Sequence, residues 1–431
     1  MTPSISVIIP NFNGREHLAA CLKSLAALDY PEDRVQVWLA DNGSTDDSLA
    51  FVRDHFPHVR TMAFGENLGF AVAINRAAHA ADSDYLAFLN NDARADPGWL
   101  REAVRVAESA GPETAAIASR ILSWDGRQLQ FAGGGSSFHG VGFQAGMGEP
   151  AGQPQGEPEP TLFACGAAML VRRQAYIDSG GFDEDFWAYY EDVDLGWRLW
   201  VLGYRVLYAP ASVVYHRHSA TASRLPVYQL RVLHIRNPLY AVFKNYGAEA
   251  LEHILAPTLL LSLQRTLRLA DIPAHEFRIG IAFPSDRRGH GWQWRQSLKT
   301  AVAWLARGRN LAGMTDGSHL ELSRVAAADL VAYRDFLAGL PALITKRTGI
   351  QARRLRPDRE ILPLFRRPFW SVETDPDYAQ LFATIKEFFG IEAYFSSEGE
   401  RDVPPDGAVS GVAGALSPRH PVASLPSDQD E

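Results

Sequence analysis

The stretch SVIIPNFNG at residues 6–14 joins a short apolar run rich in β-branched residues to a polar end. The same pattern returns in VQVWLADNGS at residues 35–44 and in DYLAFLNND at residues 84–92. Between the first two runs, residues 14–28 place their apolar side chains on one helical face. Alternating strands and helices predict a parallel sheet that is covered by helices on both faces. We therefore expect an α/β fold.

The composition limits the class of protein. The chain has 431 residues, of which 46% are hydrophobic and 21% charged, as in ordinary globular proteins. A net charge of −8 does not favour a nucleic-acid partner, because such proteins usually carry a basic face. The two cysteines have no metal-binding spacing, and no signal peptide or apolar run of about 20 residues is evident. We expect a cytoplasmic protein, with at most peripheral contact at the inner face of the membrane.

The sequence pattern changes twice along the chain. Residues 1–226 carry the strand–helix alternation, and residues 227–396 are mostly helical in pattern. Residues 397–431 are rich in Pro, Gly, Ser and Asp, which predicts a disordered tail. Within the first part, the Gly- and Pro-rich residues 133–160 predict a mobile loop. The oligomeric state cannot be inferred from the sequence.

Polar segments follow the predicted strands at residues 10–14, 41–44, 65–69 and 90–92. Asn, Asp and Gly are common turn formers, so each segment alone is weak. Together they favour a polar cleft, because ligands of open parallel sheets bind at the carboxyl ends of the strands. Neither GxGxxG after the first strand nor GxxxxGK[ST] occurs, which excludes a dinucleotide fingerprint and a P-loop.

Two carboxylates stand at these strand ends. Asp41 can accept hydrogen bonds from a base N–H or from ribose hydroxyls. Asp92, which follows Asn90 and Asn91, suits Mg²⁺ or Mn²⁺ bridging a diphosphate, because such ions take one or two carboxylates plus substrate oxygens.

The segment GGFDEDFWAYYEDVDLGWR at residues 180–198 places several carboxylates at a predicted helix start. Asp194 and Arg198 are four residues apart and are expected to pair, which leaves Asp192 free. The aromatic side chains nearby would lower the local dielectric constant and help Asp192 to act as a general base. An acidic helix start beside ordinary core aromatics is the alternative.

The tetrapeptide Tyr215-His216-Arg217-His218 follows a strand-like run. If the strand continues, His216 and His218 point to the same side. Either histidine can serve as a metal ligand or a phosphate donor. A purely structural role is the alternative.

These segments, in this order, resemble family 2 glycosyltransferases and their rhamnosyltransferase-like branch. The match covers about residues 4–221 and rests on SVIIPNFNG, ADNGSTDDS, GENLGFAVAINRA, LNNDARADPGWL, ACGAAMLVRR, GGFDEDFWAYYEDVDLGWRLWVLGYRV and VVYHRHSAT. The resemblance implies a GT-A fold, which is a Rossmann-like, mostly parallel sheet sandwiched by helices, here with a helical C-terminal extension. Residues 1–226 would be the catalytic domain, with a nucleotide-binding half at about 1–95 and an acceptor and catalytic half at about 96–226.

The resemblance also implies an activity. It is the inverting transfer of a sugar from a nucleotide diphosphate-sugar to a hydroxyl of a glycan or lipid-linked saccharide, as in cell-surface polysaccharide biosynthesis. The branch favours dTDP-rhamnose as donor and leaves UDP-sugars open.

The family roles transfer to matching positions of this sequence. Asp192 matches the general base, Glu191 is its acidic neighbour, and Asp92 and His216 would hold Mg²⁺ or Mn²⁺. Asn90 stands where the family's DxD has its first Asp. Trp187, Tyr190 and His218 are candidate contacts to the acceptor or sugar. The nucleotide-sugar would contact Pro10, Asn11, Asn13, Asp41 (at the base), Asn42, Ser44, Asn67, Gly69, Asn75, Arg76, Asn90 and Asn91.

Other interpretations stay open at this point. One is a non-catalytic module that binds carbohydrate or nucleotide. Another is a sugar-nucleotide pyrophosphorylase, which would carry a Gly-rich loop with Arg and Lys where this chain has PNFNG. The role of the helical region is also open. Its basic cluster of Arg353, Arg354, Arg356 and Arg359 could meet an anionic lipid or a diphosphate, or could simply be a solvated helix face.

Overall fold

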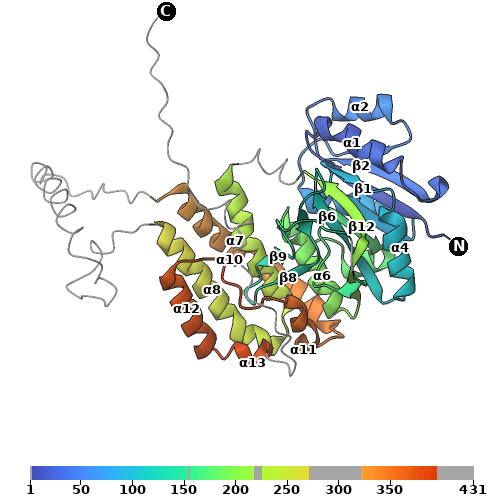
Figure 1. The fold of residues 1–431 in the computed structure, drawn as a ribbon. Helices are drawn as coiled ribbons and strands as arrows, with labels where there is room; N and C mark the ends of the chain where they lie inside the picture. The colour runs from blue at the N-terminus through green and yellow to red at the C-terminus, as the bar shows by residue number, and fades with distance from the viewer. Residues whose placement is uncertain (1, 154–155, 218–225, 271–321, 396–431) are drawn as a thin grey trace, which may run out of the picture.

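The computed structural model describes residues 2–153, 156–217, 226–270 and 322–395 (Figure 1). His218 and the tail predicted to be disordered at residues 397–431 lie outside the described residues.

A ten-stranded sheet forms the centre of the described structure. Its strands are β1 (Ile5–Asn11), β2 (Val35–Asp41), β3 (Arg60–Ala63), β4 (Tyr85–Leu89), β5 (Ala93–Ala95), β6 (Thr114–Ser123), β7 (Leu129–Phe131), β10 (Glu159–Pro160), β11 (Ala168–Arg172) and β12 (Arg205–His216). The order across the sheet is β10-β12-β6-β11-β4-β1-β2-β3, with β5 beside β12 and β7 beside β6.

The direction of the strands decides which residues meet. Strand β1 is parallel to β2 and β4, β2 is parallel to β3, and β6 is parallel to β12. Strand β11 instead runs antiparallel to both of its neighbours, β4 and β6, so the sheet is mixed. Because β11 is reversed, its beginning meets the carboxyl end of β4, and the residues just before Ala168 lie at the polar edge.

Six helices flank the strands of the first half: α1 (Arg15–Leu25), α2 (Ser48–His55), α3 (Phe70–Ala80), α4 (Trp99–Ser109), α5 (Arg173–Ser179) and α6 (Glu191–Val201). Helix α3 packs on β1 and β2, and α4 packs on β6 and β12. Helix α1 buries Leu18, Cys21, Leu22 and Leu25, the face that its sequence period predicts. All five residues of β4 are buried, as expected for a strand covered on both faces.

The predicted helical region is confirmed. It contains α7 (Val227–Asn245), α8 (Ala248–Ala270), α10 (Arg324–Ala352), α11 (Asp358–Ile361), α12 (Pro376–Phe388) and α13 (Glu392–Phe395), and Figure 1 shows it on one side of the sheet. It shares the core of the first half, since the Trp197 ring of α6 lies edge-on to Tyr246 at 4.7 Å and to Phe365 at 5.0 Å. The proposed domain boundary at residue 226 stays a prediction.

The prediction of a mobile loop is wrong for residues 134–144. They form the hairpin of β8 (Gly134–Ser136) and β9 (Gly142–Gln144), and Phe138 at its tip is fully buried. The Phe138 N–H donates to the Pro368 carbonyl (2.8 Å), and the Tyr246 hydroxyl donates to the Phe138 carbonyl (2.9 Å). The hairpin is ordered by residues more than 100 positions downstream, which local composition cannot show.

We predict that Gly134→Ala destabilises the protein by roughly 1–3 kcal/mol, because a β-carbon there would lie 2.3 Å from the Phe163 ring and overpack the core. Thermal or urea unfolding measures the change. Gly349→Ala is the matched control, because a β-carbon at this position of α10 meets no atom within 4 Å and should stabilise the helix by about 0.5–1 kcal/mol. Unchanged stability of the Gly134 variant would contradict the packing of the hairpin.

Candidate functional site

Hydrogen bonds join the carboxyl ends of β1, β2 and β4. Asn11, the last residue of β1, donates from Nδ2 to Asp41 Oδ1 (2.9 Å) and accepts at Oδ1 from Asn91 Nδ2 (2.7 Å). All three side chains are buried. Three segments that are far apart in the sequence therefore meet at one edge of the sheet, as the polar strand ends predicted.

Asp41 links the end of β1 to the turn after β2 through its hydrogen bonds. Its Oδ1 also accepts from the Ser44 hydroxyl (2.6 Å), and its Oδ2 accepts from the Ser44 N–H (3.0 Å). Its exposed fraction is 1%. Since both oxygens are already bonded within the protein, Asp41 shapes the turn at residues 41–44, and Oδ2, which has one donor, is the oxygen with an acceptor position left for a base.

A second group of bonds holds the turn before α3 against the end of β2. Asn42 donates from Nδ2 to Asn67 Oδ1 (2.9 Å) and to the Gly69 carbonyl (3.0 Å), and its Oδ1 accepts from the Leu68 N–H (2.8 Å). Gly69 has a φ of +89°, and a β-carbon there would lie 2.5 Å from the Trp187 ring. Trp187 therefore reaches this turn from the 180–198 segment.

Two further nucleotide-side candidates lie in the first loop. Asn13 adopts a left-handed backbone, with φ 50°. Its Oδ1 accepts from the N–H groups of Thr45 (2.7 Å) and Asp46 (3.2 Å), so it organises the loop that follows β2. Pro10 is half-buried in β1 beside it.

Asn75 and Arg76 are placed differently from each other. Asn75 donates to the Phe182 carbonyl (2.8 Å) and to Glu184 Oε1 (3.1 Å), and it accepts from the Tyr176 hydroxyl (2.6 Å) and the Phe182 N–H (3.0 Å). With all four positions used internally, its amide holds the start of the 180–198 segment. Arg76 is exposed, and its guanidinium lies 5.3 Å from the centre of the Phe64 ring.

Asp92 and His216 face each other at the end of β4. Asp92 Oδ1 lies 3.1 Å from His216 Nε2, and Asn90 Nδ2 lies 3.4 Å from the same nitrogen. His216 Nδ1 lies 3.0 Å from Gln130 Oε1, while Gln130 Nε2 donates to the His216 carbonyl (3.0 Å). This pairing assigns a proton to Nδ1. Nε2 then faces Asp92 Oδ1, so an imidazole nitrogen and a carboxylate oxygen, two common ligands of divalent cations, meet at one point.

The residues present therefore fit a divalent cation. Burial raises the pKa of Asp92, but the hydrogen bond and the charge of His216 outweigh burial and hold it below its usual value. An ionised carboxylate is what such a cation needs. No group of three or more His, Cys, Asp or Glu residues that could hold a metal occurs in the described part of the chain. Two protein ligands suffice for Mg²⁺ or Mn²⁺ where water and substrate phosphates complete the set.

Asp192 lies at the start of α6, next to the same edge. Its Oδ2 accepts from the Gly166 N–H (2.9 Å), and its Oδ1 accepts from the Val193 N–H (2.8 Å). The Asn90 N–H in turn donates to the Ala167 carbonyl (3.0 Å), which ties the residues before β11 to the Asn90–Asp92 segment. Burial raises the pKa of Asp192, and the two backbone hydrogen bonds offset part of this rise.

Glu191 is held in a different state from its neighbour. It is buried, and its Oε2 has no hydrogen-bond partner within the described ranges. Burial and the charge of Asp192 raise the pKa of Glu191 well above its usual value. The two N–H groups that donate to Asp192 favour its ionised form, whereas Glu191 Oε2 has no such donor among the described residues.

The loop before α6 has an unusual backbone. Trp187, Tyr189 and Tyr190 all have positive φ, at 63°, 65° and 67°. Such conformations cost roughly 1–3 kcal/mol each outside glycine and gather at functional sites. Tyr190 lies close to Gly142 of β9, whereas Trp187 lies against Gly69, so the two predicted sugar contacts point to different parts of the site.

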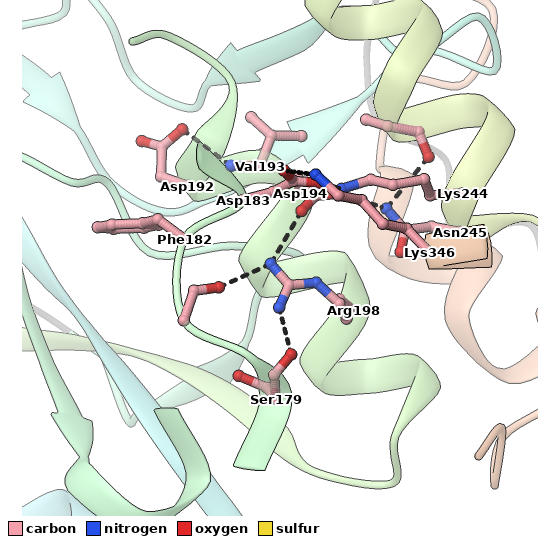
Figure 2. A network of polar contacts seen from close by, with 12 residues as sticks. Ser179, Phe182, Asp183, Asp192, Val193, Asp194, Arg198, Lys244, Asn245 and Lys346 are labelled. Atoms are coloured by element: carbon pink, nitrogen blue, oxygen red, sulfur yellow. Dashed lines mark hydrogen bonds and ion pairs between the residues drawn. The ribbon is translucent and has the colours of Figure 1, made fainter. Parts of the chain in front are cut away.

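A buried cluster of charges lies behind Asp192 (Figure 2). Asp194 accepts from Arg198 (2.9 Å), which confirms the predicted pair, and its other oxygen accepts from Lys244 Nζ (2.9 Å). Lys244 also contacts Asp183, and Lys346 lies 2.5 Å from Asp183. Figure 2 shows Asp192 pointing away from this cluster. The sequence analysis missed both lysines, because no spacing links α7 and α10 to this segment.

Three of the four arginines of the predicted basic cluster are bonded to other parts of the protein. Arg353 donates to the Asp178 carbonyl (2.7 Å), and Arg356 donates to the Tyr204 carbonyl (2.9 Å). Arg354 pairs with Asp358 (2.9 Å). Arg353 and Arg356 thus join the helical region to residues of the first half, Arg354 braces the helical region internally, and Arg359 is exposed. No described helix is long and apolar enough to cross a bilayer.

The sequence is similar to those of known proteins. Residues 6–180 match the family model of glycosyl transferase family 2. The chain is 30% identical over 275 residues to N-acetylglucosaminyl-diphospho-decaprenol L-rhamnosyltransferase of Mycobacterium tuberculosis, which covers 57% of this chain and 87% of that protein. It is 32% identical over 231 residues to O-antigen biosynthesis protein RfbC of Myxococcus xanthus, which covers 51% of this chain and 18% of that protein.

Two solved structures are also similar. One is mannosyltransferase PcManGT from Pyrobaculum calidifontis in complex with GDP-Man and Mn²⁺, with 18% identity and a TM-score of 0.44 over 78% of this chain and 88% of that chain. The other is GalNAc-T7 with UDP, GalNAc and Mn²⁺, with 17% identity and a TM-score of 0.48 over 59% of this chain and 50% of that chain.

We predict that Lys244→Met lowers the free energy of unfolding by about 3 kcal/mol or more, because it leaves Asp183 and Asp194 buried without the cation they share. Urea unfolding followed by circular dichroism measures this. Lys386→Met is the matched control. Its partner Glu392 is largely exposed, so the same change should cost about 1 kcal/mol or less. Equal costs for the two variants would refute the importance of the buried cluster.

Proposed function

Because this chain belongs to glycosyltransferase family 2 and has the GT-A fold, we propose that it is an inverting enzyme that uses a nucleotide diphosphate-sugar. The acceptor is a hydroxyl of a glycan or of a lipid-linked saccharide. Family membership also removes the pyrophosphorylase alternative. The observation that carries the proposal is Asp192, a half-buried carboxylate with a raised pKa that is tied through Gly166 and Ala167 to the Asn90–Asp92 segment.

Asp192 acts as the general base in this proposal. A raised pKa makes its carboxylate a better proton acceptor. It takes the proton of the acceptor hydroxyl, and the oxygen forms a bond to the anomeric carbon. The bond from that carbon to the diphosphate oxygen breaks on the opposite face, and the nucleotide diphosphate leaves with the electron pair. The raised pKa of Glu191 disfavours a second negative charge beside the base.

Asp92 and His216 are the residues that would hold Mg²⁺ or Mn²⁺. When bound, the ion supplies positive charge to the departing diphosphate. Gln130 keeps the His216 ring oriented toward Asp92, a supporting contact of the kind that metal-binding histidines usually have. The Asn90 amide, 3.4 Å from His216 Nε2, is close enough to contribute a neutral oxygen or a hydrogen bond to the same site.

The donor would lie along the carboxyl ends of β1 and β2. The turns at Asn13, Asn42 and Ser44, which are held by hydrogen bonds, would supply polar groups that contact the nucleoside. We favour dTDP-rhamnose, because of the similarity to an L-rhamnosyltransferase, with UDP-sugars as the alternative. A role in cell-surface polysaccharide biosynthesis follows from the same relatives. Use of a cytoplasmic nucleotide-sugar pool implies a cytoplasmic enzyme, with peripheral membrane contact where the acceptor is lipid-linked.

A panel of dTDP-rhamnose and UDP-sugars with Mg²⁺ or Mn²⁺ tests the proposal. We expect transfer by the native protein, and a loss of about 100-fold or more in kcat for Asp192→Asn, because the amide cannot accept the proton. Nucleotide affinity, measured by calorimetry, should be retained. Asp178→Asn, at an exposed position of α5, is the matched control and should transfer normally. Nucleotide binding without transfer by the native protein would favour the non-catalytic module.

The pH dependence gives an independent prediction. Asp192 must be ionised to act, and its folded pKa lies above the usual value of about 3.9 for Asp. We therefore expect kcat/KM to fall on the acid side with a midpoint above pH 4. Initial rates across a pH series, together with nucleotide binding over the same range, separate loss of the base from loss of the donor. A midpoint at or below pH 3.9 would rule out Asp192 as the titrating group.

A further inference from the structure

The loop at residues 186–190 is held from two sides. On one side, the Trp187 carbonyl accepts from the Ala71 N–H at the start of α3 (3.2 Å). On the other side, the carbonyls of Phe186, Ala188 and Tyr189 accept from a single side chain, Asn237 Nδ2, at 3.1, 2.9 and 2.7 Å. The loop therefore connects the nucleotide edge of the sheet to helix α7.

Asn237 is suited to this task by its chemistry. It is fully buried, and its Oδ1 accepts from Arg236 Nε (3.0 Å), which orients Nδ2 toward the loop. Arg236 adds a bond from its guanidinium to the Asp185 carbonyl (2.8 Å). Three carbonyls pointing at one spot need a donor. A carboxylate of the same shape would place oxygens against oxygens.

The loop leads directly into the catalytic helix. Tyr190 is the residue before α6, and its carbonyl accepts from the Asp194 N–H (2.9 Å), so the loop sets the first turn that carries Asp192. Lys244, which contacts Asp194, lies seven residues after Asn237 on α7. A spacing of seven places both side chains on one face of the helix. Helix α7 thus contacts residues 186–194 at two points, through the Asn237 amide and through the Lys244 ammonium group.

We propose that Asn237 is a positioning residue for sugar transfer, and that α7 is part of the catalytic site. Asn237 keeps residues 187, 189 and 190 at positive φ, which seats Trp187 against Gly69 and aims Asp192 toward the strand ends. This inference rests on the proposed function. It assigns the helical region a role that the sequence left open, since the match to the family model ends at residue 180.

Asn237→Ala, Asn237→Asp and the control Tyr240→Phe test the proposal in the full-length protein. Tyr240→Phe removes one hydrogen bond from the same helix to Asp335 but keeps the ring that packs on Phe186. For Asn237→Ala we expect kcat to fall about 100-fold, the scale for a misplaced catalytic group, while affinity for the nucleoside diphosphate stays unchanged. Asn237→Asp should be worse than Asn237→Ala, because its oxygens repel the three carbonyls. The control should match the native protein.

Hydrogen exchange separates this proposal from the proposed function. Peptides covering residues 183–194 should lose protection in Asn237→Ala and keep it in Tyr240→Phe. If the native protein transfers no sugar, the proposed function fails, and exchange still decides whether Asn237 holds the loop. Full kcat in Asn237→Ala, native protection of the 183–194 peptides, or an Asn237→Asp variant more active than Asn237→Ala would each overturn the positioning role. A large loss of melting temperature with kcat per folded molecule unchanged would also overturn it.

Discussion

The Asn11 side chain holds the polar edge of the sheet together, because it donates to Asp41 and accepts from Asn91 at the same time. Buried polar groups must find partners or lose roughly 1–3 kcal/mol each. At this edge the partners come from three different strands. The arrangement satisfies buried amides and a buried carboxylate and, in doing so, brings the ends of β1, β2 and β4 within reach of one ligand. The site thus depends on hydrogen bonds that also stabilise the fold.

The carboxylates around α6 are separated by their surroundings into different states. Burial raises the pKa of Asp192 and of Glu191, and the charge of Asp192 adds to the rise at Glu191. Asp183 is buried too, but the charges of Lys244 and Lys346 outweigh burial and lower its pKa. A carboxyl group whose pKa is raised is useful for proton transfer, whereas a carboxylate that stays ionised can anchor a cation. The lysines from the helical region thus supply the ionic support of Asp183 and Asp194, and in the part of the chain that the structure describes neither lysine forms an ion pair with Asp192.

This division explains why the helical region packs so closely against α6 and the segment before it. Breaking a buried charge pair is expensive, so Lys244 must stay between Asp183 and Asp194. The positive φ values of residues 187, 189 and 190 also need outside support, which Asn237 provides. Arg353 and Arg356, which follow α10, donate hydrogen bonds to the Asp178 and Tyr204 carbonyls of the first half. A catalytic helix held at several points can keep a carboxylate aimed at a substrate.

Local patterns in the sequence were enough to predict the alternation of strands and helices, the apolar face of α1, the polar strand ends and the Asp194–Arg198 pair, since each depends on residues close together in the chain. The reversal of β11, the buried hairpin at residues 134–144 and the left-handed loop before α6 were decided only by the tertiary structure. So were the partners of Asp41, which turn its carboxylate inward. These features arise from contacts such as Asn237 to Tyr189 and Tyr246 to Phe138, between segments that the chain separates by dozens of residues or more. Such contacts leave no periodicity behind, because the free energy they contribute is realised only when the whole core has assembled.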